Sequence, residues 1–242
     1  MADAVKETAA DAVNDTAADA VNETAVLERL LTDRWSCRGF TDEAVPRDVI
    51  ERLLTIAQRT PSWCNTQPWQ VVVTSAEETK KLREALLASL DPSHSDFDFP
   101  ASYNGVYRDR RRESGWQLYE AVGVRKGDRD ASAVQMLRNF EFFGAPHAAI
   151  LTTDEDLGVY GAIDCGLYVD TFLLAAQALG LGACAQAALA ACAPFLREYF
   201  DLPDTRKVVC GIAFGYADRE HATATYRTSR ASLDEVVTFV GE

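Results

Sequence analysis

Two arginines and a serine alternate in the segment at residues 34–40, which reads Arg-Trp-Ser-Cys-Arg-Gly-Phe. In an extended backbone, residues two apart point to the same side, so Arg34, Ser36 and Arg38 would project together. Guanidinium groups and a hydroxyl suit a phosphate, and each charge-assisted hydrogen bond contributes about 1.5 to 3 kcal/mol. Arg230 would add a third guanidinium group to this pair if the chain folds back. The alternative is a surface patch of ion pairs with neighbouring carboxylates.

A second polar segment follows at residues 61–69 and reads Pro-Ser-Trp-Cys-Asn-Thr-Gln-Pro-Trp. The side chains of Asn65 and Gln67 can each donate and accept hydrogen bonds, which matches the edge of a flat polar ring such as a flavin or its ribityl hydroxyls. The two prolines fix the backbone that aims them. The alternative is a helix-to-strand turn with Trp69 in the core, which explains the prolines but not the two amides. Together, the two segments indicate a site for flavin mononucleotide.

The chain has 242 residues, of which 48% are apolar, so it can bury a sizeable core. It carries 37 acidic residues against 24 lysines and arginines, a net charge of -13. Proteins that bind nucleic acids or anionic membranes need the opposite field, so we expect neither partner. Because the protein as a whole is acidic, a cluster of arginines must be explained by a local structural or functional role.

Six cysteines are scattered through the chain without a Cys-x-x-Cys pair, and only three histidines are present. This spacing predicts no metal site. We expect each cysteine to be a small apolar core residue, including Cys37 and Cys64 in the two segments. Free thiols without a secretory signal favour a cytoplasmic protein.

Residues 3–26 form three eight-residue repeats that begin Asp-Ala-Val. At about 100° per residue, the valine rotates by about 80° from one repeat to the next, so no single apolar stripe forms. We expect residues 1–25 to be a disordered or frayed acidic tail, with docking to a partner as the alternative. The folded domain would then span residues 26–242.

Hydrophobic periodicity predicts helices and strands along the rest of the chain. Helices are expected over residues 46–59, 76–90, 116–124, 131–143 and 164–180. Strands are expected over residues 69–74, 148–153 and 208–216, and a long loop over residues 91–115. The helix at residues 164–180 is apolar almost all round, which is typical of burial on every side, and a second subunit would explain it. It carries Asp164 and Asp170, so we do not expect it to span a membrane.

The common catalytic signatures are missing from the sequence. The segment at residues 180–185 reads Gly-Leu-Gly-Ala-Cys-Ala, but it follows a helix, whereas a Rossmann phosphate loop follows a strand. A nucleophile elbow, a P-loop and a zinc-protease motif are also missing. The chemistry is therefore expected to belong to a bound organic cofactor.

The order of the motifs resembles the FMN-dependent nitroreductase family. An Arg-x-Ser-x-Arg-x-Phe start, a Pro-Ser-x-x-Asn-x-Gln-Pro-Trp turn, an apolar helix ending in Gly-Leu-Gly, a late strand ending in Gly-Tyr, and an arginine ahead of Leu-Asp-Glu-Val-Val follow in sequence. The resemblance covers the chain from about residue 26 onward. It implies an α+β fold with a central, mostly antiparallel sheet flanked by helices, in a domain-swapped homodimer.

By this resemblance, the FMN site is formed by Arg34, Trp35, Ser36, Arg38, Pro61, Ser62, Trp63, Asn65, Gln67, Arg138, Ala185, Gln186, Ala187, Ala188 and Arg230. The first motif would bind the phosphate and ring edge together with Arg230. The residues at 61–67 would come largely from the neighbouring subunit, and Arg138 would lie near the ribityl chain. Residues 185–188 would present backbone amides near the flavin N5. Many relatives carry a Pro-x-Glu-Gly type segment there, so a backbone contact survives in this chain and a carboxylate role does not.

The resemblance further implies that residues 103–116, with Tyr119, roof the substrate pocket. The basic run at residues 108–112 would meet the 2'-phosphate of NADPH or an anionic nitroaromatic, with a solvated helix face as the alternative. NADH or NADPH would reduce FMN, and a nitroaromatic or quinone acceptor would reoxidise it in a ping-pong cycle. Other reactions on the same fold, namely reductive dehalogenation and flavin-dependent dehydrogenation, are alternatives, as is a non-catalytic flavin-binding module.

Overall fold

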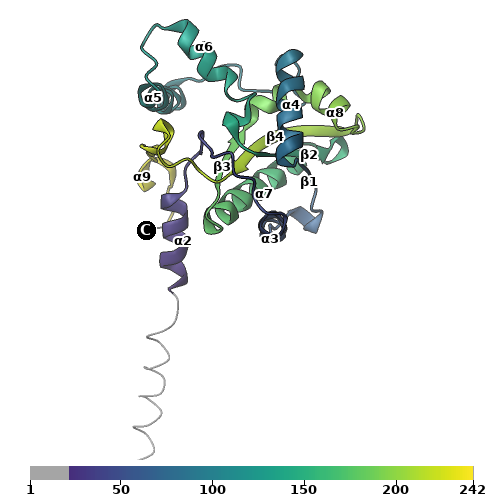
Figure 1. Ribbon diagram of the computed structural model, residues 1–242. Helices are drawn as coiled ribbons and strands as arrows, with labels where there is room; N and C mark the ends of the chain where they lie inside the picture. Colours follow the sequence, from purple (N-terminus) through teal and green to yellow (C-terminus); the bar gives the residue numbers. More distant parts are fainter. Residues whose placement is uncertain (1–21, 242) are drawn as a thin grey trace, which may run out of the picture. The chain divides into compact units, whose positions relative to one another are not determined.

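The computed structural model describes residues 22–241, which divide into one unit ending at Arg34 and a second beginning at Trp35 (Figure 1). The first unit contains helix α2 (Glu23–Asp33), which is capped by the Asn22 side chain accepting the Ala25 N–H at 3.0 Å. Residues 1–21 of the expected acidic tail lie outside the described residues. Its last positions already belong to α2, and the domain start at residue 26 stays a prediction.

The second unit is built on a four-stranded sheet in the order β1-β2-β4-β3. The strands are β1 (Gln70–Val73), β2 (His147–Asp154), β3 (Gly182–Gln186) and β4 (Arg206–Gly215). Every neighbouring pair is antiparallel, which confirms the predicted α+β class and antiparallel sheet. Strands β1 and β3 form the two edges. The sequence prediction missed β3, because its glycine and alanines carry little β propensity.

The helices of this unit are α3 (Arg47–Ala57), α4 (Ala76–Ala88), α5 (Gly105–Ala121), α6 (Arg129–Leu137), α7 (Gly158–Ala178), α8 (Ala193–Tyr199) and α9 (Leu233–Val236). The expected loop over residues 91–115 is therefore wrong in its second half, where α5 has formed. The prolines of this stretch lie at positions 92 and 100, before the helix. Helix α5 is mostly polar and buries none of its residues, so hydrophobic periodicity did not reveal it.

Helices α3 and α7 cover one face of the sheet, and α4 and α8 cover the other (Figure 1). Strand β2 shows the resulting alternation, since Ala149 and Leu151 join the core under α7 while Ala148 and Ile150 join the core under α4. Both faces of the central strands are thus buried. This arrangement leaves the sheet edges and the strand ends as the places where a ligand can approach.

Within one chain, helix α7 is buried on one side and exposed on the other, and its burial by a second subunit stays a prediction. Tyr168 and Phe172 face the core, whereas Val159, Tyr160, Ile163 and Leu167 are about half exposed or more. The stretch Glu155–Ala178 is long and apolar enough to cross a membrane by length and composition. Its contacts with α3, β2 and β3 are those of the core helix of a folded domain. Exposure of this apolar face to water is energetically unfavourable.

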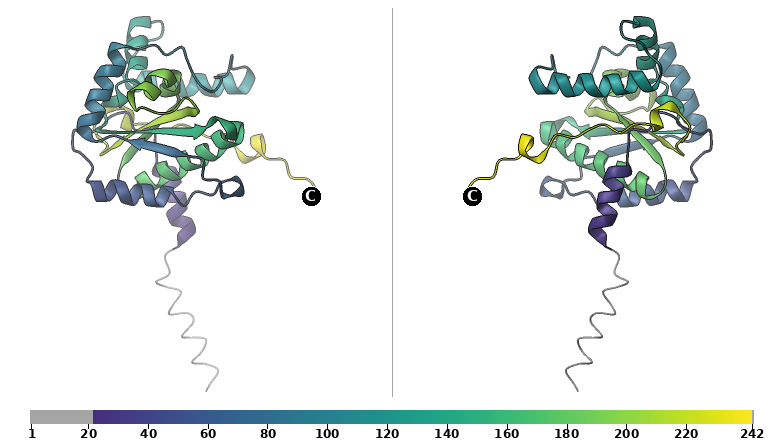
Figure 2. Two further views of the ribbon diagram at one scale, coloured as in Figure 1. Left: turned by 90° about the vertical axis from the view of Figure 1, so that its right-hand side faces the viewer. Right: turned by 90° about the vertical axis from the view of Figure 1, so that its left-hand side faces the viewer.

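The chain after β4 leaves the sheet and carries the short helix α9 (Figure 2). Apolar side chains at its end are strongly exposed, with Phe239 at 65% and Val240 at 93%. Within the second unit, this segment lies against α5, and together they form the pocket described below.

Candidate functional site

The first polar segment lies along the edge strand β3. Ser36 forms an isolated parallel bridge with Ala183, and the Cys37 N–H donates to the Ala183 carbonyl at 3.1 Å. Further along, Phe40 forms an antiparallel bridge with Ala217, just after β4. The segment is therefore held in extended form by the sheet, as the alternation of its polar residues predicts.

Position 39 of this segment must be glycine, because the backbone there passes too close to the His221 side chain to leave room for a Cβ atom. A Cβ atom on Gly39 would lie 2.2 Å from the His221 Cγ, which no real side chain tolerates. The residue before Gly39 is Arg38. Its guanidinium carbon lies 5.6 Å from the Phe143 ring centre, and its guanidinium group donates to the Ser36 carbonyl at 3.2 Å. Arg38 thus lies between the edge of the sheet and the turn that contains Phe143.

The Trp35 ring is contacted by two arginines that the sequence prediction missed. The guanidinium carbon of Arg227 lies 4.4 Å from the ring centre and that of Arg219 lies 5.3 Å from it. Nearby, burial raises the pKa of Tyr226, and the positive charge of Arg38 opposes that rise. Three arginines therefore gather around the first segment. A search of the sequence for basic residues around positions 219–230 would have found Arg219 and Arg227. In an acidic chain, basic residues that lie so close together indicate a local function.

The structure does not assign two of the expected phosphate ligands, Arg34 and Arg230, to this cluster. Arg34 is the residue that ends α2, and it closes the first unit, so its position relative to Ser36 and Arg38 is not described. Arg230 is exposed, and its guanidinium donates to its own segment, to Thr228 Oγ1 at 2.9 Å and to the Ser229 carbonyl at 2.8 Å. The roles of both in phosphate binding stay predictions.

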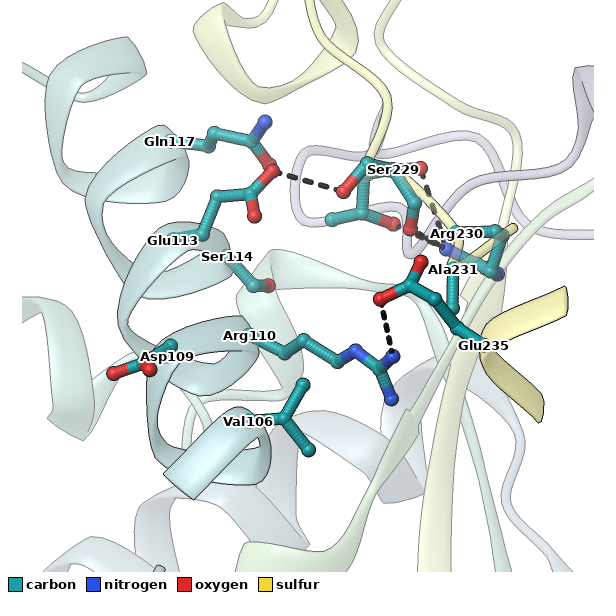
Figure 3. Close-up of a pocket in the computed structure, with 11 residues that line it drawn as sticks. Val106, Asp109, Arg110, Glu113, Ser114, Gln117, Ser229, Arg230, Ala231 and Glu235 are labelled. Atoms are coloured by element: carbon teal, nitrogen blue, oxygen red, sulfur yellow. Dashed lines mark hydrogen bonds and ion pairs between the residues drawn. The ribbon is translucent and has the colours of Figure 1, made fainter. Parts of the chain in front are cut away.

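Arg230 lines a cavity of about 500 Å³ between α5 and the C-terminal segment (Figure 3). Across it, Arg110 of α5 points toward Glu235 at 3.4 Å, and the Ser229 hydroxyl donates to Glu113 at 2.8 Å. Gln117 Oε1 is buried here without a hydrogen-bond partner among the described residues. The basic run of α5 thus contributes Arg110 to a pocket that is lined by both positively and negatively charged side chains.

The end of β3 exposes Ala185 and Ala187 but buries the Gln186 side chain, which is 2% exposed. Gln186 donates to the Asn139 carbonyl at 2.7 Å, and its Oε1 has no partner among the described residues. The adjacent Arg138 pairs with Glu141 at 2.8 Å. The Gln186 side chain is therefore turned into the protein, and the backbone contact with the cofactor that the resemblance implies stays a prediction.

The second polar segment forms a tight turn in residues 62–67. Its Ser62 hydroxyl accepts the Gln67 N–H at 2.9 Å, and the Gln67 side chain accepts from Gln58 at 3.1 Å. In the described part of the chain, Asn65 uses its exposed side-chain amide in no hydrogen bond, so that amide is available to a ligand. Cys64 is also exposed, so the expectation of a core cysteine is wrong there, whereas Cys37 is buried.

The two polar segments lie at opposite edges of the sheet. Residues 62–67 lead into β1, whereas Ser36, Arg38, Arg138 and residues 185–188 gather near β3. Four adjacent strands separate the two edges by about 14 Å, at roughly 4.8 Å per step. One chain therefore assembles the arginine-rich half of the expected site, and it does not bring the turn at residues 62–67 to that half.

Comparison with known proteins identifies relatives over nearly the whole chain. A family model described as the nitroreductase family matches residues 31–216. A 4-nitrobenzoate reductase of Nocardioides sp. is 34% identical over 220 residues, covering 88% of this chain and 89% of the relative. The nitroreductase NfnB of Mycolicibacterium smegmatis is 34% identical over 215 residues, covering 88% of this chain and 92% of the relative.

Solved structures agree with this relationship. The crystal structure of the FMN-dependent nitroreductase NfnB from Mycobacterium smegmatis in complex with NADPH superposes with a TM-score of 0.86 at 33% identity, covering 90% of this chain and 99% of that chain. The FMN- and NADPH-dependent nitroreductase NfnB from Sphigopyxis sp. strain HMH gives a TM-score of 0.85 at 30% identity, covering 89% of this chain and 99% of that one.

Proposed function

This chain belongs to the nitroreductase family, and we propose that it is an FMN-dependent oxidoreductase that uses NAD(P)H to reduce nitroaromatic compounds. The observation that carries the proposal is the arginine cluster beside β3, in which Ser36 and Arg38 lie next to the exposed end of that strand. A bound FMN would supply the hydride-transfer chemistry between NAD(P)H and the acceptor. The chain itself supplies binding, orientation and shielding.

The residues beside β3 fit a flavin phosphate and ring. Ser36 and Arg38 supply a hydroxyl and a guanidinium group, and we expect Arg34 and Arg230 to complete the phosphate site. The exposed backbone at Ala185 and Ala187 offers hydrogen-bonding groups at the strand end. The buried Gln186 packs beneath them and keeps that backbone in place through its bond to Asn139. Two further arginines, Arg219 and Arg227, would help to overcome the repulsion between a phosphate and an acidic protein.

We propose that the turn at residues 62–67 completes the site of a second copy, so that the active form is a homodimer. The turn lies at the sheet edge remote from β3, and its Asn65 amide is exposed. The apolar face of α7 and the apolar end of the chain are exposed as well. Burying such surfaces between two copies is favourable at about 25 cal/mol per Å².

The pocket at α5 is the proposed place for the acceptor. Its Arg110 offers a cation to a carboxylate such as that of a nitrobenzoate, with Glu235 as the counter-ion in its absence. Quinones are proposed as further acceptors, because they are flat and electron-poor in the same way. Free thiols at Cys37, Cys64, Cys165, Cys192 and Cys210 suit a reducing compartment, and we propose a cytoplasmic location.

The purified protein tests this function through its colour. We expect a yellow protein that NADPH bleaches under anaerobic conditions and that recovers its colour when a nitroarene is added. Replacing Arg34 and Arg38 together by alanine should give colourless protein, and full FMN content in that variant would refute the phosphate assignment. A flavin carrier would stay yellow with NADPH, and turnover of a halogenated substrate without nitroarene reduction would favour the dehalogenase alternative.

A further inference from the structure

Asp164 is a buried carboxylate on helix α7 that the proposed chemistry does not use. It is 5% exposed, and its Oδ2 accepts the backbone N–H of Trp63 at 3.1 Å. The two residues are 101 positions apart in the sequence. Burying a carboxylate is costly unless it gains hydrogen bonds, so a buried aspartate on a backbone N–H points to a specific structural task.

The turn that Asp164 contacts has a strained backbone. Cys64, Asn65 and Gln67 have φ angles of 52°, 54° and 48°, in the left-handed region that residues other than glycine rarely adopt. Such a conformation is unfavourable for a residue other than glycine, so the surrounding contacts must hold it there. The turn therefore needs attachment to the body of the domain.

Hydrogen bonds within the turn close it on itself. The Asn65 N–H donates to the Ser62 carbonyl at 3.0 Å, and the Thr66 N–H donates to the Trp63 carbonyl at 3.1 Å. These bonds shape the turn but leave its position relative to the helices open. The bond from Trp63 to Asp164 ties the turn to α7, and the Trp63 ring reinforces it by lying 4.8 Å from the Tyr160 ring on the same helix.

On the other side, the turn is tied to α3. Gln58, which ends that helix, donates to Gln67 at 3.1 Å and accepts the indole N–H of Trp69 at 3.0 Å. The turn is thus held between two helices, through Gln58 at one end and Asp164 at the other. Asn65, with its available amide, lies between these two anchors.

We propose that Asp164 is a positioning residue that holds residues 62–67 in the conformation that binds FMN. This inference rests on the proposed function, in which Asn65 and its neighbours contact the cofactor. The carboxylate acts through the backbone of Trp63 and touches no reacting atom. Because it is fixed in the first third of α7, it couples the cofactor turn to the core helix of the domain.

Three variants test the proposal in the full-length protein. Asp164→Ala removes the acceptor, Asp164→Asn keeps a neutral acceptor of the same shape, and Asp204→Asn is the control at an exposed aspartate outside α7 and outside the proposed dimer face. We expect Asp164→Ala to weaken FMN binding by about ten- to a hundredfold, the effect of losing one charge-assisted hydrogen bond. Asp164→Asn should recover part of this affinity, and Asp204→Asn should match the wild type.

Hydrogen–deuterium exchange of the FMN-free protein supplies the second measurement. The peptide over residues 61–69 should exchange faster in Asp164→Ala than in the wild type, with other peptides unchanged. Wild-type FMN affinity and wild-type exchange of this peptide in folded Asp164→Ala would overturn the proposal. If Asp164→Ala does not fold, faster exchange in Asp164→Asn than in Asp204→Asn supports the anchor, and equal exchange overturns it.

The two proposals fail in different ways. If the wild-type protein takes up no FMN, the proposed function is wrong, and the exchange measurement still decides whether Asp164 anchors the turn. If the wild type binds FMN and reduces a nitroarene while Asp164→Ala behaves identically, only the positioning role is wrong.

Discussion

The guanidinium carbon of Arg227 lies 4.4 Å from the centre of the Trp35 ring, although the two residues are far apart in the sequence. This contact joins the first motif of the chain to the segment that follows β4. It places an extra cation beside the residues that we propose for the FMN phosphate. The first prediction follows from it.

Replacing Arg227 by alanine should weaken FMN binding by about three- to tenfold, because the Trp35 ring loses a cation–π partner worth roughly 0.5 to 1 kcal/mol and the phosphate loses a nearby charge. Arg227→Lys should bind FMN more tightly than Arg227→Ala, since it keeps the charge. Titration of the apoprotein with FMN, followed by flavin fluorescence, measures the affinities. Equal affinity of the alanine variant and the wild type would exclude this contribution.

Gly39→Ala should destabilise the protein by about 1 to 3 kcal/mol, because its Cβ would overlap His221 and force the backbone of the first motif to shift. Gly115→Ala is the matched control, since a Cβ there meets nothing within 4 Å in the middle of α5. The control should be neutral or more stable by about 0.5 to 1 kcal/mol. Urea unfolding of both variants checks this, and equal stability of the two would contradict the close approach.

Cys64 should be the cysteine that reacts first with a thiol reagent in the native protein, because it is exposed while Cys37, Cys165, Cys184, Cys192 and Cys210 are buried. We expect about one fast equivalent at pH 8 and six in denaturant, with the fast one absent from Cys64→Ser. Saturating FMN should slow the labelling of Cys64, since this residue lies in the turn proposed to bind FMN. Unchanged labelling with bound FMN would argue against that placement.

Stability should fall at alkaline pH because of the buried thiols. Burial raises the pKa of Cys165 and of Cys210 to about 12 and that of Cys37 to about 11, from an ordinary 9.0. The folded-state pKa lies above the unfolded one, so this stabilisation is complete below pH 9 and is lost as the pH rises toward 11 to 12. Each thiol contributes a slope of up to about 1.4 kcal/mol per pH unit.

Urea unfolding between pH 7 and pH 11 measures this loss. Replacing Cys210 by alanine removes one titrating thiol, so the decline above pH 9 should be shallower than in the wild type. A decline that begins well below pH 9, or that is unaffected by the Cys210 change, would show that other groups are responsible.

Much of the fold was predictable because local patterns carry it. The valines of β1, the apolar run of β2 and the strand ending at Gly215 have the composition of strands, and α3 and α4 show clear helical periodicity. The sequence patterns did not predict strand β3 or helix α5, for opposite reasons. The first is stabilised by pairing with β4 despite small residues, and the second is a polar helix with no buried stripe.

The sequence alone determined the family resemblance, the antiparallel α+β class and most of the residues proposed to contact FMN, because motif spacing and hydrophobic period are local properties of the chain. The tertiary structure decided which of these residues meet. It brought Arg219 and Arg227 to Trp35, tied Trp63 to Asp164, and separated the two polar segments to opposite sheet edges. The physical reason is that strand order and helix packing are set by burial of the whole core, which no short segment encodes.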